Sequence, residues 1–261
     1  MKKTGFVLML FFAMACNNKD TVKNNENKDI NGQFDVYKEA FVAELWKLYP
    51  GWAAQQGYDK YDTVLTVLSD EYRKQELSFT VSHLDSLKLY TVDNLSALNK
   101  IDYRLIENAL TSIQWYINEY REYEWNPSYY NVAEGFAQIM NDKKISLEEK
   151  LRKISLRINN VPAYYANAGK NIKNATIEHT DLAIQQNKGA LDYFEKVLKD
   201  SLIKAKMGAD ESQILEAKIN ESIAAIKDYG SWLEQELKPG LKPETARRFR
   251  LGKELYLPRY Q

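Results

Sequence analysis

The sequence contains one cysteine and two histidines among 261 residues, so two side chains that often bind metals are scarce. Because Cys16 is the only cysteine, the folded part has no internal disulfide and no cysteine nucleophile. His83 and His179 are 96 positions apart, whereas a catalytic zinc site usually takes three protein ligands, two of them histidines on one helix. An inverted His-x-x-Glu-His motif ending at His179 has Ala175 in place of its first ligand. We therefore predict no metal site and no catalytic residue in this chain.

An excess of basic residues is also missing. Lys plus Arg and Asp plus Glu each number 36, and surfaces that bind nucleic acid normally carry a basic excess, so no nucleic-acid partner is expected. The sequence has no Gly-x-Ser-x-Gly elbow, phosphate loop or dinucleotide fingerprint. Arg247, Arg248 and Arg250 form a small basic cluster, which we interpret as a solvated helix face. Binding of a substrate carboxylate is the alternative.

Strand patterns are almost absent. Only residues 64–68 resemble a strand, and no partner strand is evident. Apolar residues instead recur at spacings of three and four, which is typical of helices packed on one face. We predict an all-α fold, a bundle-like array of about eight or nine helices, with the helical domain at residues 34–261.

Capping and breaking residues mark the expected helix ends. Ser69, Ser96 and Thr176 are predicted N-caps, and capping boxes are predicted at Ser146 and Asp210. A last helix is expected from residue 243, where a proline suits the first turn, to about residue 257.

Apolar spacing also predicts which helix faces are buried. The helix over 70–89 is expected to bury Leu77, Val81 and Leu84, with His83 on its surface. The longest helix is expected over 97–124. Its predicted buried row comprises Leu98, Ile101, Leu105, Ala109, Ile113, Tyr116 and Tyr120.

The N-terminus resembles a bacterial lipoprotein signal. Lys2 and Lys3 precede an apolar run that is too short for a permanent membrane span, and small residues lead up to Cys16. We predict a signal peptide at 1–15, a lipid anchor on Cys16 and a disordered polar tether at 16–33. These features imply membrane attachment in the bacterial cell envelope, periplasmic or surface-exposed. A plain signal peptide with an incidental cysteine is the alternative.

Three segments together resemble one protein family. They are FVAELWKLYPGWAAQQGYDKYD at 41–62, RINNVPAYYANAGKNIKNATIEHTDLAIQQNKGALDYF at 157–194 and RFRLGKELY at 248–256. In this order they resemble blocks of the bacterial family of unknown function numbered 885, often found as lipoproteins. That family is similar to mostly helical zinc peptidases of the zincin type. Its His-Glu and Pro-Gly-His motifs follow the third block, and this sequence stops at Gln261, so no metal ligand can be assigned here.

The resemblance implies that this chain is the N-terminal half of a lipid-anchored, metallopeptidase-like hydrolase and is inactive alone. Zinc is expected only with the C-terminal half, and a peptide is the expected substrate of the full-length form. Tyr165 and His179 are the residues expected to line the cleft. The alternative is a non-catalytic, lipid-anchored helical module that binds peptide or glycan through a surface rich in tyrosine and tryptophan. A half-protein should expose a broad apolar face, and a self-sufficient module should not.

Overall fold

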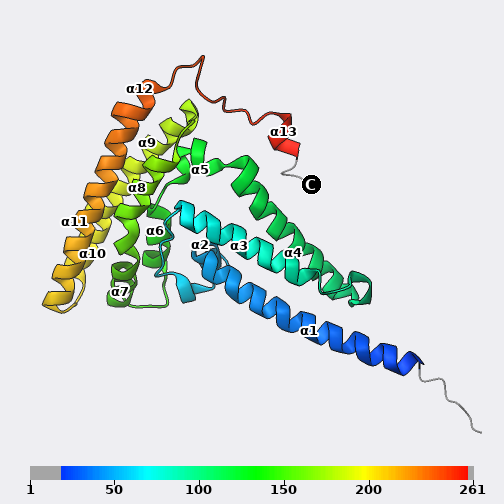
Figure 1. Ribbon diagram of the computed structural model, residues 1–261. Coiled ribbons are helices and arrows are strands. Elements are labelled where there is room, and N and C mark those ends of the chain that lie inside the picture. Colours follow the sequence, from blue (N-terminus) through cyan, green and yellow to red (C-terminus); the bar gives the residue numbers. More distant parts are fainter. Residues whose placement is uncertain (1–18, 258–261) are drawn as a thin grey trace, which may run out of the picture.

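The computed structural model describes the backbone of residues 19–257 and the side chains of residues 30–257 (Figure 1). The predicted signal peptide at 1–15 and Cys16 lie outside the described residues. The all-α class is confirmed, because 79% of the described residues 19–257 are helical and none of them forms a strand. The helices are α1 Lys19–Leu48, α2 Pro50–Gln55, α3 Asp70–Leu87, α4 Ala97–Trp115, α5 Glu122–Trp125, α6 Ala133–Asn141, α7 Leu147–Arg157, α8 Val161–Asn171, α9 Ile177–Asp192, α10 Lys199–Lys204, α11 Ala209–Trp232, α12 Lys238–Gly240 and α13 Lys253–Tyr256.

Helices α1, α3 and α4 form an elongated arm with its own hydrophobic core (Figure 1). Aromatic rings fill much of this core, and Phe34 packs edge-on against Tyr90 with ring centroids 5.0 Å apart. Edge-on contacts of this kind add to the free energy gained from apolar burial. The buried residues of the arm are Phe34, Phe41, Leu45, Leu87, Leu95, Tyr103, Ile106 and Leu110.

Helices α6 to α11 form a bundle around a second and larger core (Figure 1). Helix α11 packs along both α8 and α9, and the fully buried side chains of Leu215, Ile219 and Ile226 face this contact. The bundle therefore contains α8 and α9, which make up most of the family-like segment 157–194.

The segment between α2 and α3 joins the arm to the bundle without forming a strand. Its carbonyl groups accept hydrogen bonds from bundle side chains: Arg157 Nη1 donates to Asp62 O at 2.6 Å, and Asn160 Nδ2 donates to Leu65 O at 2.8 Å. Asn171 Nδ2 donates to the next carbonyl in this series, at residue 68, over 2.7 Å. The β-like run at 64–68 thus has side-chain donors in place of the missing partner strand.

The predicted N-caps are confirmed at four helix starts. Each cap side chain accepts a hydrogen bond from the backbone N–H three residues later: Ser69 from Tyr72, Ser96 from Asn99, Ser146 from Glu149 and Thr176 from His179. The capping box predicted at Asp210 is wrong. Helix α11 begins at Ala209 behind Gly208, and Asp210 instead lies in the first turn, where its charge favours the helix dipole.

The predicted buried rows on two helices are wrong in part: Tyr120 is buried and Ile113 and Leu84 pack against the arm core, but other members are exposed. Leu98, Ile101 and Leu105 are 66%, 57% and 63% exposed, because α4 turns its opposite face toward the arm core. On α3, Val81 is exposed and His83 is buried. Both helices carry apolar residues on more than one face, so spacing alone could not select the packed one.

Two long helices expected from the sequence are shorter. The one expected over 97–124 is broken at Arg121, which adopts a left-handed conformation with φ 50° after a π-helical turn at 116–120. The last helix is reduced to α13, because residue 247 pairs with Thr176 in an isolated parallel bridge and Gly252 turns the chain with φ 80°. Helix α1 begins at Lys19, so most of the 16–33 segment expected to be a tether is helical here.

Substitution of Gly230 tests the contact between α9 and α11. A Cβ added there would lie 2.3 Å from the Oδ1 of Asn187, whose Nδ2 donates to Ile226 O at 3.0 Å. We expect Gly230→Ala to lower the free energy of unfolding by about 1–3 kcal/mol, since buried Asn187 must move.

Gly189→Ala on exposed α9 surface is the matched control, because a Cβ there meets nothing within 4 Å. It should stabilise the protein by up to about 1 kcal/mol, the usual preference for alanine in a helix. Urea unfolding measures both changes. Equal effects of the two substitutions would contradict this packing.

Candidate functional site

His179 lines an open cavity of about 670 Å³. The walls come from α5 and the turn before it, from the start of α9 and from the returning C-terminal segment. The lining residues are Tyr120, Glu122, Trp125, His179, Phe249, Arg250, Leu251, Gly252, Lys253 and Tyr256. Most of this wall is aromatic or basic, and the expected role of His179 in lining a substrate cleft stays a prediction.

The imidazole of His179 is fixed by its neighbours. Its Nδ1 lies 2.6 Å from Thr176 Oγ1, which also accepts from the backbone N–H of His179 over 3.2 Å. The ring stacks on Phe249 at 5.2 Å and meets Trp125 edge-on at 5.4 Å. Burial lowers the pKa of His179 below its ordinary value of 6.5, against the smaller raising effects of Glu122 and Glu178. The site therefore favours the neutral imidazole.

The C-terminal segment is held against this site by Arg247. Its guanidinium lies 4.8 Å from the centroid of the Trp125 ring, a cation–π contact. Arg250 lines the cavity, whereas Arg248 is exposed. The interpretation of these arginines as one face of a helix is wrong, because residues 247–250 are not helical.

Tyr165 lies elsewhere in the bundle. Its side chain is buried and its ring lies 4.7 Å from that of Tyr229. It borders a smaller cavity of about 330 Å³ with Gly169, Asp228 and Trp232. Burial raises the pKa of Tyr165 well above its usual range. Tyr165 and His179 therefore do not line one common cavity.

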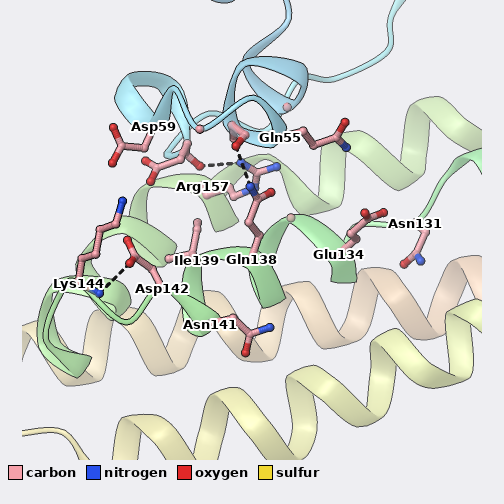
Figure 2. A pocket seen from close by; sticks show the side chains of 15 residues that line it. Gln55, Asp59, Asn131, Glu134, Gln138, Ile139, Asn141, Asp142, Lys144 and Arg157 are labelled. Atoms are coloured by element: carbon pink, nitrogen blue, oxygen red, sulfur yellow. Dashed lines mark hydrogen bonds between the residues drawn. The ribbon is translucent and has the colours of Figure 1, made fainter.

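A second, polar cavity lies where α2 and the following loop meet α6 and α7. Its volume is about 510 Å³, and Figure 2 shows Arg157 between the segment that carries Asp59 and the helix that carries Gln138. The labelled polar lining residues are Gln55, Asp59, Asn131, Glu134, Gln138, Asn141, Asp142, Lys144 and Arg157. Amide and carboxylate groups thus dominate this wall.

Arg157 is the buried cation of the polar cavity. Only 8% of the residue is exposed, its Nε has no hydrogen-bond partner, and burial lowers the pKa of the guanidinium. Gly135 leaves it room, because a Cβ at that position would lie 2.4 Å from Arg157 Nη2. The role of Arg157 was not predictable from the sequence, since the glycine that accommodates it lies on another helix.

Zinc does not fit the residues described here. No three His, Cys, Asp or Glu side chains within residues 30–257 lie close enough together to hold a metal ion. His179 is next to a threonine and two aromatic rings, which are not zinc ligands.

Comparison with known families gives a match over residues 50–260 to DUF885, described as bacterial protein of unknown function. This chain belongs to the DUF885 family. The matched residues include the linings of all three cavities described above. The comparison with curated proteins gives no match.

A solved structure from Shewanella oneidensis has the same fold. It is described as a candidate lipoprotein of unknown function, is 37% identical and superposes with a TM-score of 0.82. The similarity covers 87% of this chain and 41% of the other, so this chain spans less than half of that relative's length. Among residues 19–257, no helix has both the length and the hydrophobicity to cross a membrane.

The lowered pKa of His179 predicts a pH dependence of stability. Because the unfolded histidine titrates near 6.5 and the folded one at lower pH, the unfolded chain binds more protons as pH falls through this range. Wild-type protein should therefore lose stability from pH 7.5 to 5.5 more steeply than His179→Phe. Phenylalanine keeps a ring between Trp125 and Phe249 but cannot titrate.

Urea unfolding at the two pH values measures this difference. An NMR titration of the His179 ring should give a midpoint below 6.5. Parallel stability profiles for the two proteins would contradict the assignment.

Proposed function

We propose that this DUF885 chain is the N-terminal helical part of a lipid-anchored, metallopeptidase-like hydrolase, and that the His179 cavity forms one wall of its peptide-binding cleft. The main observation that supports this proposal is that two family-like segments meet at one cavity. His179 comes from the segment 157–194, whereas Phe249, Arg250 and Tyr256 come from 248–256.

The chemistry of this wall suits a peptide. Trp125, Phe249 and Tyr256 offer apolar rings, and Arg250 and Lys253 offer positive charge for a substrate carboxylate or carbonyl group. A neutral imidazole at His179 can donate or accept a hydrogen bond at a peptide group. The residues described here bind and orient substrate in this proposal, while zinc and its catalytic chemistry belong to the part of the protein outside this chain.

Two further observations support the proposal. The Shewanella relative is more than twice as long as the matched region. Helix α4 exposes the apolar row Leu98, Ile101 and Leu105, which is the kind of surface expected where another part of the protein packs.

The envelope location is part of the proposal. Cys16 would carry the lipid, and the candidate lipoprotein from Shewanella oneidensis supports this role. The protein would then be attached to a membrane through its lipid anchor and face the periplasm or the cell surface.

The metal content of the purified chain and the mass of the native protein test the hydrolase proposal. The chain from Cys16 to Gln261, purified alone, should hold no stoichiometric zinc by elemental analysis and cleave no peptide in a mixed-sequence library. Native protein extracted from membranes should have a mass well above that of this chain. Stoichiometric zinc with peptide cleavage by the short chain would refute the proposal.

The second candidate function is a non-catalytic module for glycan or peptide, which the polar cavity of Figure 2 favours. Sugar hydroxyls and peptide groups both pair with amides and carboxylates like those of Asn131, Glu134 and Asn141. A native mass equal to that of the short chain plus acyl groups would favour this candidate.

A thermal-shift screen with glycans and peptides tests the module. We expect at least one compound class to raise the Tm, since a ligand that binds only the folded state stabilises it. Glu134→Ala, which alters an exposed lining residue, should abolish the shift, whereas Glu216→Ala on the exposed surface of α11 should keep it. Failure of every compound, or an unchanged shift in Glu134→Ala, would count against it.

A further inference from the structure

A fourth cavity lies where the arm meets α5, and tyrosine is the commonest residue in its lining. Its volume is about 400 Å³, and it opens between α3, the π-helical turn after α4, and α5. The lining residues are Tyr49, Leu68, Tyr72, Arg73, Glu76, Ile113, Tyr116, Ile117, Glu122, Tyr123 and Tyr129. Neither proposed function uses this cavity, and the inference below stands independently of both.

Two of the tyrosine hydroxyls donate hydrogen bonds to backbone carbonyl groups. Tyr72 donates to Leu48 O at 2.8 Å, and Tyr123 donates to Ile117 O at 3.4 Å. Tyr49 and Tyr72 meet edge-on with centroids 6.5 Å apart. Engaged hydroxyls hold the rings in place, so the cavity is enclosed by oriented aromatic surfaces.

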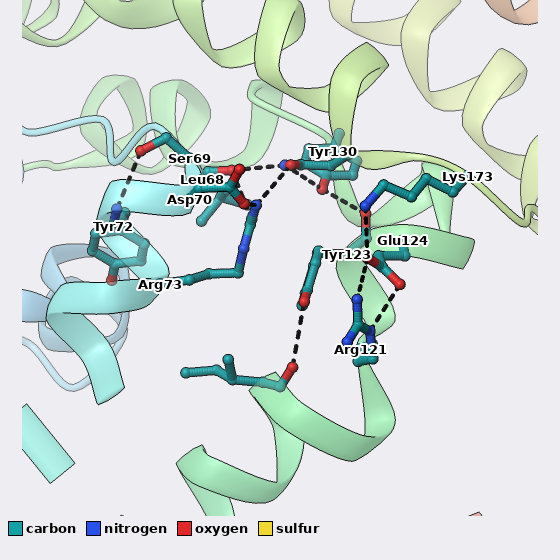
Figure 3. A network of polar contacts seen from close by, with 12 residues as sticks. Leu68, Ser69, Asp70, Tyr72, Arg73, Arg121, Tyr123, Glu124, Tyr130 and Lys173 are labelled. Atoms are coloured by element: carbon teal, nitrogen blue, oxygen red, sulfur yellow. Dashed lines mark hydrogen bonds and ion pairs between the residues drawn. The ribbon is translucent and has the colours of Figure 1, made fainter. Parts of the chain in front are cut away.

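The positive charge of Arg73 is already balanced. Its guanidinium donates to Leu68 O at 3.0 Å and to Asn171 Oδ1 at 2.9 Å, pairs with Asp70, and lies 4.2 Å from the centroid of the Tyr123 ring. Figure 3 shows Arg73 reaching away from α3 toward this network. Arg73 therefore has a carboxylate partner, Asp70, and an amide partner, Asn171, that are not part of the cavity lining.

The carboxylates of the cavity have no cation from the described residues within ion-pair distance, although the Tyr49 hydroxyl and the charge of Arg73 both act on Glu76. None of the ion pairs found within residues 30–257 includes Glu76 or Glu122. Glu122 accepts a hydrogen bond from Asn126 Nδ2 at 2.8 Å. Burial raises the pKa of Glu76 to about 7, against the smaller lowering effects of Tyr49 and Arg73. A partly buried carboxylate among aromatic rings is costly to ionise without a paired cation, so a bound cation would stabilise its charged form.

We propose that this cavity binds an organic ammonium group, with the Glu76 carboxylate as its counter-ion and the tyrosine rings as its walls. Ring faces carry negative electrostatic potential and attract a cation within about 6 Å. A cation would pair with Glu76 in a partly desolvated site, where the attraction is stronger than in water. An anion would be repelled by Glu76 and Glu122. A neutral ligand would leave the Glu76 carboxylate without a positively charged partner in the cavity.

Glu76 also gives the binding a pH dependence. The charged and titratable groups that face it are Arg73 on α3, Glu122 on α5, and the five tyrosines of the lining. Burial holds the pKa of Tyr49 and Tyr72 well above the usual range, so both stay neutral near pH 7. Ammonium binding should therefore strengthen as pH rises from 6 to 8 and Glu76 ionises.

Calorimetric titration of the full chain with choline, pentylamine and 3,3-dimethyl-1-butanol tests the proposal. The third compound has the shape of choline without its charge. At pH 8, at least one of the two cations should bind at least tenfold more tightly than the neutral compound, and more tightly than at pH 6. Equal binding of the neutral compound, or no binding of either cation, would overturn the proposal.

Variants place the ligand in this cavity. Glu76→Gln should weaken cation binding at least tenfold and abolish its pH dependence, and it removes a buried charge without changing side-chain shape. Tyr116→Leu, which removes one ring wall, should also weaken binding. Glu71→Gln, on the exposed side of α3, is the matched control and should leave binding unchanged. Wild-type affinity in Glu76→Gln would refute the assignment.

Discussion

Hydrogen bonding to the carbonyls of residues 62–68 is the constraint on which the arrangement of this molecule depends. An extended segment without a neighbouring strand leaves backbone acceptors that cannot be buried unpaired. Arg157, Asn160 and Asn171 supply the donors, and all three come from α7, α8 and the turn between them. These bonds position the arm on the bundle, since the arm and the bundle have separate hydrophobic cores.

Two of the cavities border this same segment. Asp62 and Arg157 line the polar cavity on one side, and Leu68 and Arg73 line the tyrosine cavity on the other. Long side chains span a wider gap than a direct pairing of two strands, so space remains beside each of these contacts. The same bonds that connect the two cores therefore also create the recesses in which a ligand can bind.

Local sequence signals predicted the helix starts well, because a cap such as Ser96 acts within three residues of itself. The choice of buried face on α4 was not predictable, since it depends on what the helix meets in space. The site residues divide in the same way: some can be named from the local sequence, and others only from the fold. His179 was named from a family-like segment, but Phe249 joins it only through the return of the C-terminal segment, and Trp125 only through the contact of α5 with the start of α9. Arg157 and Glu76 acquire their roles from burial by distant residues.

Three helices contain π-helical turns, at 116–120, 193–198 and 233–237. Such a turn holds one residue more than a regular α-helical turn, and the surplus is confined to that turn. Loss of one residue there would restore a regular helix and keep the faces on both sides in phase. Loss of one residue elsewhere would rotate everything beyond it by about 100°. The turns at 193–198 and 233–237, which continue into further helical residues, are therefore places where a helix can change length in evolution without repacking either core.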